Sequence, residues 1–268
     1  MRPRELFEVR RPLSRGLTLA LGSIFCVLVL LAWAFVTAGP VEERIVSPVI
    51  LPSPGEILES LPSLIERREL GSNTWVSFVR VVKGFGLAVL VVVPLGLLMG
   101  SFGPVKAFFE PLNVIAGYLP LITIIPLSFA WFLPIGEEFQ KLMFLALACS
   151  FYMLPMVVGA VENVDETFVN TAQTLGANRL ELVGKVLFPI ALPDIYQAAR
   201  LAFGVGWTWI IVAETLLADK GLGFIFMTSY RFEKPHMYWT ALVILVIGFL
   251  TDRILDVLGR RLFPYRYL

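Results

Sequence analysis

Long apolar stretches separated by short polar segments dominate the sequence. Six of them reach the roughly 20 residues that a helix needs to cross a hydrocarbon core about 30 Å thick. They cover residues 17–38, 74–100, 111–132, 139–161, 194–217 and 237–259. Every backbone polar group in lipid needs an internal partner, and a barrel would require short alternating strands instead. The pattern therefore predicts an all-α polytopic membrane protein with about six transmembrane helices, the first retained rather than cleaved as a signal peptide.

The polar segments define the predicted organisation. It comprises an N-terminal tail (1–16), a first transmembrane helix (17–38), an external loop with a short amphipathic helix (39–73), a five-helix core (74–259) that contains a cytoplasmic loop (162–193), and a C-terminal tail (260–268). Basic residues near the ends of the spans are more numerous on the side of the N-terminus. The positive-inside rule then places both termini in the cytoplasm, which agrees with an even number of spans.

Two loops on the opposite side carry their own signals. Ser53 as an N-cap and Pro54 at the first helical position predict a helix that continues to Leu70, with Pro62 kinking or splitting it. Residues 218–236 contain a Gly-Leu-Gly turn followed by aromatic residues, which indicates a re-entrant or interfacial element rather than a free linker.

Composition excludes several classes of function. The chain is 57% hydrophobic and 16% charged, with a mean hydropathy of +0.78, which is too apolar for a soluble domain. The formal net charge is only +1 and the cations are scattered, so we expect no nucleic-acid partner. One histidine, His236, and two cysteines within apolar runs cannot form a usual zinc site. No GxxxxGK[ST] phosphate-binding loop occurs, so we expect ATP to be bound elsewhere.

The longest cytoplasmic loop divides into two short helices at a glycine. The first helix is predicted to start after Asp165, a good N-cap, and to end at Leu175, where Gly176 permits a turn. The second starts at Asn178, with Glu181 three residues later in a capping-box arrangement. Pro189 is expected to end it, because proline cannot continue the hydrogen-bond ladder. A helix-turn-helix elbow exposed to the cytoplasm is the result.

The same loop resembles the EAA loop of ABC importer permeases, in which EAA is followed by three residues, Gly, nine residues, Ile, one residue and Leu-Pro. Here Asn-Thr-Ala begins at residue 170, and Gly176 and Pro189 stand at the matching positions; Asn170, Thr171, Val186 and Phe188 depart from the pattern. The resemblance implies that residues 170–185 dock in a groove on a partner ATPase. The coupling residues would be Asn170, Thr171, Ala172, Leu175, Gly176, Ala177, Asn178, Arg179, Glu181 and Pro189.

Resemblance extends over most of the chain to the permease branch that handles nitrate, bicarbonate, taurine and alkanesulfonates. It is carried by motifs such as LPSP from residue 51, PLGLLMG from residue 94, LGA from residue 175 and GLG from residue 221. It implies a type I importer (MetI-like) fold in the bacterial inner membrane and a non-catalytic permease homodimer. Two ATPase subunits, which use ATP and Mg, and an external solute-binding protein would complete the transporter. The cargo would be a small anion, or alternatively a neutral or cationic heterocycle such as a thiamine-precursor pyrimidine.

Ionisable and polar residues within the spans are candidates for the translocation pathway. They are Arg80, Lys83, Trp207, Thr208, Trp209 and Glu214. Arg80 and Lys83 lie three apart on one helical face and could attract an anion, although both can also extend to the membrane interface. Glu214 could instead cap the Gly221–Gly223 loop or pair with Arg80, and the tryptophans could serve packing. Asp252 and Arg253 are expected to form a local or interhelical pair.

Two rival classes remain for comparison. A secondary transporter driven by an ion gradient would show inverted repeats with broken helices and a coupling acid near the midplane, and neither feature is clear here. A membrane-embedded enzyme would need a converging constellation of nucleophile, base or paired acids, and the spans hold none.

Overall fold

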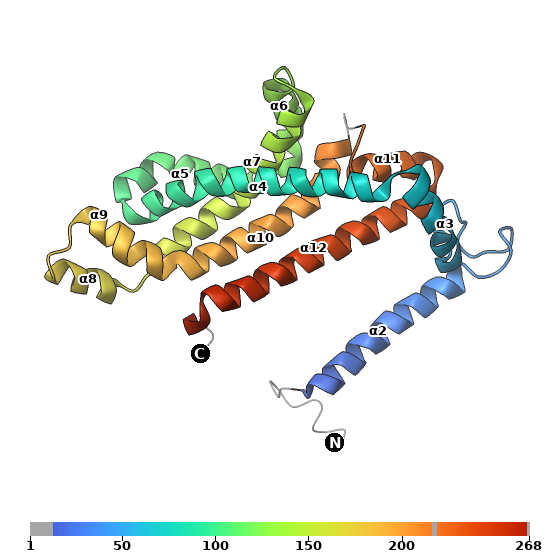
Figure 1. Ribbon diagram of the computed structural model, residues 1–268, viewed down its shortest axis with the longest axis horizontal. Helices are drawn as coiled ribbons and strands as arrows, with labels where there is room; N and C mark the ends of the chain where they lie inside the picture. The colour runs from blue at the N-terminus through green and yellow to red at the C-terminus, as the bar shows by residue number, and fades with distance from the viewer. Residues whose placement is uncertain (1–12, 216–218, 267–268) are drawn as a thin grey trace.

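The computed structural model describes residues 13–215 and 219–266, and within these ranges every regular element is a helix (Figure 1). The long helices are α2 (Arg15–Val36), α4 (Leu70–Ser101), α7 (Glu137–Glu162), α10 (Phe188–Thr215) and α12 (Lys234–Leu262). The shorter ones are α3 (Pro54–Arg67), α5 (Gly103–Tyr118), α6 (Ile124–Phe132), α8 (Glu166–Thr174), α9 (Arg179–Glu181) and α11 (Leu222–Phe232). Residues 1–12 of the predicted tail, 216–217 of the fifth predicted span and 267–268 lie outside the described residues. The predicted all-α class is confirmed.

Helices α4 and α7 pack closely because glycines line their contact. Gly84, Gly96 and Gly100 of α4 face Leu145, Val157 and Val161 of α7, in that order. A Cβ atom at any of the three glycines would lie only 2.6–2.7 Å from a side-chain atom of its α7 neighbour. Small residues at such spacings let two backbones approach, which is how membrane helices gain van der Waals contact. The register of α4 on α7 therefore depends on these glycines.

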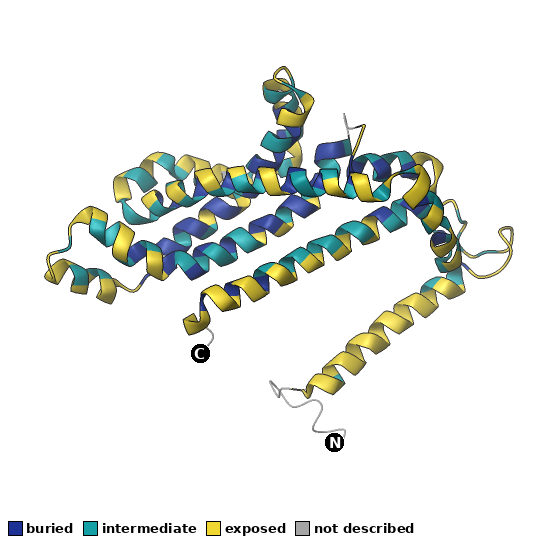
Figure 2. Ribbon diagram, in the orientation of Figure 1, coloured by how far each residue is buried: buried dark blue, intermediate teal, exposed yellow. Residues whose placement is uncertain are grey.

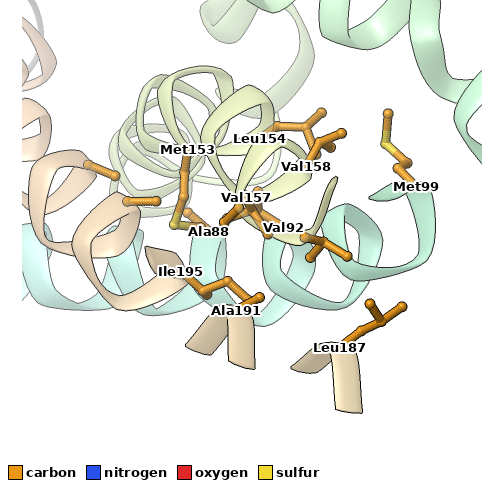
Figure 3. Close-up of a cluster of buried hydrophobic side chains, with 14 of the residues drawn as sticks. Ala88, Val92, Met99, Met153, Leu154, Val157, Val158, Leu187, Ala191 and Ile195 are labelled. Carbon is orange, nitrogen blue, oxygen red and sulfur yellow. The ribbon is translucent and has the colours of Figure 1, made fainter. Parts of the chain in front are cut away.

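The apolar core extends from this contact to α10. Val92 and Met99 of α4 pack with Met153 and Val157 of α7, and Ile195 of α10 completes the cluster (Figure 3). Figure 2 shows the same distribution, with buried residues concentrated on α7 and α10 and on one side of α4. Cores packed to this density hold the helices in one arrangement. The bundle of α4, α7 and α10 is thus the rigid centre on which the other helices are placed.

Helix α2 stands apart from this bundle (Figure 2). None of its residues is buried, and Figure 1 shows it diverging from α12. It is held near its C-terminal end, where Trp33 Nε1 donates to the carbonyl of Pro52 at 2.9 Å and the Trp33 ring lies 6.4 Å from that of Tyr238. By length and composition α2, α4 and α7 can each cross a membrane. The fifth and sixth predicted spans correspond to α10 and α12, of 28 and 29 residues.

The third predicted span, residues 111–132, is not one helix. Helix α5 ends at Tyr118, Leu119 and Pro120 are extended, a 3₁₀ turn covers Leu121–Thr123, and α6 begins at Ile124. Proline lacks the N–H that the helix would need and forces the preceding residue into extended conformation. The prediction of a continuous span was wrong for this reason.

Helix α3 confirms its predicted start and corrects its predicted interruption. Ser53 caps the helix by accepting from the Glu56 N–H at 3.2 Å. The helix then continues unbroken through Pro62, so of the predicted kink or split the split was wrong, and it ends at Arg67, before the predicted end at Leu70. Contacts with α12 hold it on both sides of the proline. The indole of Trp239 donates to the Ile57 carbonyl, and Ser63 Oγ lies 2.8 Å from His236 Nε2.

The ends of the molecule carry different structures. The α8–α9 elbow lies at one end and α3 and α11 at the other (Figure 1). The second predicted external element, within residues 218–236, is observed as helix α11.

Candidate functional site

The predicted elbow between α7 and α10 is present, and its first arm has the predicted ends. Asp165 caps α8 by accepting from the Thr167 N–H at 2.7 Å. At the other end Gly176 donates to the carbonyl of Gln173 at 2.9 Å, and Ala177 donates to that of Ala172 at 3.0 Å. These two bonds form a Schellman motif, which requires a left-handed residue. Gly176 supplies it with φ of +86°.

The second arm starts at the predicted capping box. Asn178 Oδ1 accepts from the Glu181 N–H at 3.0 Å, and the Glu181 carboxylate accepts from the Asn178 N–H at 3.1 Å. Lys185 Nζ also donates to Glu181 at 2.9 Å. The hydrogen bond from Lys185 and the one from the Asn178 backbone lower the pKa of Glu181 below its ordinary value. Both arms therefore begin with a fixed cap, and the cap of the second arm lies at the tip of the elbow beside Gly176.

Pro189 does not end the second arm, contrary to prediction. Residues Leu182–Leu187 form a π-helix that continues directly into α10, and Pro189 is the second residue of α10. In the π-helix the Phe188 N–H donates to the Val183 carbonyl, five residues back. This change of register lets the ladder pass a residue that has no N–H to donate. As a result, the second arm and α10 form one helical rod from Arg179 to Thr215.

The tip of the elbow exposes apolar side chains. Leu175 and Leu180 are 83% and 82% exposed, one on each side of Gly176, and Phe168 on α8 is also exposed. Asn170, Thr171 and Arg179 are exposed beside them. Large apolar side chains on rigid backbone, surrounded by polar residues, are typical of a surface that meets another protein.

The opposite end of the rod carries a buried charge network. Glu214 of α10 has no exposed surface, and its Oε1 accepts from Arg80 Nη1 at 2.7 Å. The remaining Arg80 nitrogens donate to Glu138 of α7, with Nε 2.8 Å from Oε2. Glu214 also accepts from the Gly223 N–H at 2.9 Å. Both predicted contacts of Glu214 are therefore present, and Arg80 is fully occupied by protein groups.

Two polar residues of α4 extend this network to the start of α11. Ser77 Oγ lies 2.8 Å from Glu214 Oε2 and accepts from the Leu222 N–H at 2.8 Å. Asn73 Oδ1 accepts from the Gly221 N–H at 2.6 Å. Gly221 has φ of +117°, and a Cβ there would lie 2.4 Å from the Glu214 carboxylate. A carboxylate at a helix N-terminus satisfies free N–H groups and the helix dipole. The network thus fixes α4, α7, α10 and α11 together.

The other pathway candidates occupy different environments. Lys83 is exposed, whereas Arg80 is 6% exposed. Trp207 is buried in the core, and Trp209 packs against Phe144 with ring centroids 6.1 Å apart. Thr208 is exposed and lines, together with Trp207, a cavity of about 380 Å³ between α10 and α12. The structure therefore joins Arg80 and Glu214 in one network and leaves the other four candidates outside it.

The sequence reasoning missed several members of these contacts. Asn73 and Ser77 were overlooked, although their spacing from Arg80 places all three on one face of α4. Glu138 lies just before the fourth predicted span and was not considered. Of the local or interhelical pairing expected for Asp252 and Arg253, Asp252 shows the interhelical form, because it accepts from Arg200 of α10 at 2.7 and 2.8 Å. Arg253 shows the local form, with Nη1 3.8 Å from Asp256.

Comparison with known proteins identifies the family of this fold and elbow. The sequence profile described as "Binding-protein-dependent transport system inner membrane component" matches residues 92–264, which include both arms of the elbow and Glu214. The chain belongs to this family. It is therefore a multi-pass permease subunit of an ABC importer in the bacterial inner membrane, a system that also includes ATPase subunits and a binding protein.

Individual relatives agree over most of the chain. The taurine transport system permease protein TauC of Escherichia coli is 31% identical over 96% of this chain and 92% of its own length. The putative aliphatic sulfonates transport permease protein SsuC of Bacillus subtilis is 28% identical over 83% of this chain and 80% of its own. The nitrate import permease protein NrtB of Synechocystis is 26% identical over 80% and 81%.

Solved structures share the fold of the permease. A chain of the MetNI methionine ABC transporter in an inward facing conformation superposes with a TM-score of 0.59, at 17% identity, over 70% of this chain and 93% of its own. A chain of an amino acid ABC transporter gives 0.62, at 19% identity, over 74% and 97%. These similarities confirm the predicted importer-permease fold.

Proposed function

We propose that this permease forms the membrane route for a small anion and is moved by a separate ATPase that docks on the α8–α9 elbow. The anion class is supported by the relatives, whose names specify taurine, aliphatic sulfonates and nitrate. In this proposal the chain has no catalytic activity of its own and binds no cofactor, because ATP and Mg belong to the ATPase. A second copy of the chain forms the other half of the route, with lipid around the pair.

The observation that carries the coupling proposal is the shape of the elbow. Its tip presents Leu175 and Leu180 on capped backbone, and its second arm is continuous with α10. A rigid rod transmits a displacement at one end to the other, and a driven conformational change requires a partner that contacts the two states differently. Closure of the ATPase on residues 170–185 would therefore move the Glu214 end of α10. The elbow and both termini lie on the cytoplasmic side in this proposal.

Vesicle transport tests the proposal. The permease is reconstituted with its ATPase and binding protein, and uptake of radiolabelled taurine or an alkanesulfonate is measured with ATP inside, with a proton or sodium gradient alone, and without the ATPase. We expect uptake only when ATP and all partners are present. Uptake driven by an ion gradient in the absence of the ATPase would contradict it. A binding protein that retains only cationic ligands would contradict the anion class.

A further inference from the structure

Two cations on α4 differ in what surrounds them. Arg80 is buried, and its guanidinium is shared among Glu138, Glu214 and the Lys220 carbonyl. Lys83, less than one turn further along, is exposed and forms no ion pair with any residue that the structure describes. Of these two cations, Lys83 is the one whose charge no described protein group compensates.

The depth of Lys83 makes this free charge informative. Lys83 lies nine residues after residue 74, the predicted start of the second span, which is about 14 Å along the axis of α4. A free ammonium group exposed to hydrocarbon at such a depth is costly, so ionisable residues in spans face a polar cavity or a partner. The face of α4 that carries Lys83 therefore borders water or protein.

A cavity adjoins Lys83 at this point. It has a volume of about 330 Å³ and lies between α4 and α7, with Lys83 and Glu138 on its wall. Both Glu138 oxygens already accept hydrogen bonds, from Arg80 at 2.8 Å and from Lys141 at 3.0 Å, which compensates the carboxylate. Arg80 also lies on the wall, but its guanidinium donates to Glu138, Glu214 and the Lys220 carbonyl. The other wall residues are apolar or aromatic, namely Trp75, Val76, Val79 and Leu142. The uncompensated ammonium group of Lys83 therefore lies beside an apolar part of the cavity wall.

We propose that this cavity is a binding site for cargo of the organic-anion class, with Lys83 Nζ at the anionic head and the Trp75 wall against a short apolar body. The inference rests on the proposed function and narrows it. An alkanesulfonate has both parts, because its sulfonate accepts charge-assisted hydrogen bonds and its alkyl chain gains from apolar burial. Nitrate and bicarbonate have no apolar part for these walls to receive.

Thiol accessibility tests whether the cavity is aqueous. In the complete transporter in vesicles, Lys83→Cys on a Cys26→Ser background is treated with 2-sulfonatoethyl methanethiosulfonate, a membrane-impermeant organic sulfonate. The Cys26→Ser chain that keeps Lys83 is the control, because its one remaining cysteine, Cys149, is buried. We expect Lys83→Cys to be modified and the control to be unmodified. No modification of Lys83→Cys would overturn the inference.

Uptake separates this inference from the proposed function. Lys83→Gln should lower alkanesulfonate uptake about tenfold or more, the value of a hydrogen bond to a charged group, while Lys83→Arg retains most of it. Lys234→Gln, which removes a lysine outside the spans, is the matched control. If the unaltered transporter imports alkanesulfonate and Lys83→Gln imports it at the same rate, the cavity proposal is wrong but the proposed function stands. If the unaltered transporter imports no anion with ATP and all partners, the proposed function fails.

Discussion

Arg80 Nη1 and Glu214 Oε1 lie 2.7 Å apart and join α4 to α10 where Glu214 is completely buried. Both residues lie in predicted spans, and both are used by protein contacts rather than left open to a solute. A buried ion pair of this kind is weak evidence for added stability, but the loss of one partner strands the other charge. We therefore interpret the pair as the contact that fixes the Glu214 end of α10 to α4, and call it the joint of the α10 rod.

Removal of Glu214 should destabilise the permease severely. Glu214→Ala leaves Arg80, Ser77 and the Gly223 N–H without their shared acceptor, for an expected loss of about 3 kcal/mol or more. Thermal unfolding in detergent, followed by size-exclusion chromatography, measures the effect. Glu137→Ala serves as the control, because this carboxylate is 56% exposed and 3.8 Å from its partner Lys141. Equal stability of the two variants would contradict the role of the joint.

Two alanine substitutions on α4 should have opposite effects. A Cβ at Gly96 would lie 2.6 Å from Val157 Cγ1, whereas a Cβ at Gly86 would meet nothing within 4 Å. Gly96→Ala should therefore cost about 1–3 kcal/mol through overpacking, and Gly86→Ala should be neutral or stabilise the helix by up to about 1 kcal/mol. Unfolding midpoints of the two variants in the same detergent provide the comparison. A harmless Gly96→Ala would show that α4 and α7 are not in close contact.

The tip of the elbow should loosen at acid pH. The pKa of Glu181 is lowered in the folded protein, so its cap is fully present above the ordinary glutamate value and is lost as pH falls through the lowered value. Amide exchange at Asn178, whose N–H donates to Glu181, should accelerate over that range after correction for the intrinsic rate. Glu181→Gln should abolish this pH response. Unchanged protection of Asn178 in the unaltered protein down to that range would refute the prediction.

The contact between α10 and α12 should depend on arginine geometry at residue 200. Arg200 binds Asp252 through two nitrogens, at 2.7 and 2.8 Å, and reaches Asp256 at 2.5 Å. Lysine cannot form the bidentate pair, so Arg200→Lys should lower the unfolding temperature. Arg200→Met should lower it further, and Asp252→Asn combined with Arg200→Met should restore part of the loss. If all three variants were as stable as the unaltered protein, the pair between Arg200 and Asp252 would be dispensable.

The sequence predicted the elbow well because its signals are local. Asp165, Gly176, Asn178 and Glu181 act within a few residues of one another, and their caps are all present. Prolines were harder to interpret, since their effect depends on neighbouring structure. Pro120 breaks the third predicted span, whereas Pro62 and Pro189 lie within continuous helices, one held by α12 and the other accommodated by a π-helix.

Long-range partners could be predicted only in part. The contact of Arg80 with Glu214 follows from two costly charges that need each other, and it could be anticipated without coordinates. The choice of Glu138 as a second partner depends on the register of α4 on α7, which the glycine contacts fix. The pairing of Arg200 with Asp252 likewise requires the relative placement of α10 and α12, and no local pattern encodes it.

The coupling ratio of a Gly176 variant tests the central claim most directly. Gly176→Val forces a β-branched residue into φ of +86°, whereas Gly159→Val, near the end of α7, lies where the φ is ordinary and an added Cβ would meet no atom of another element within 4 Å. Solute imported per ATP hydrolysed is measured for both in vesicles that contain the ATPase and the binding protein. We predict that Gly176→Val inserts normally but loses most of its uptake per ATP, while Gly159→Val retains it. An unchanged ratio in Gly176→Val would contradict the claim that the elbow drives the permease.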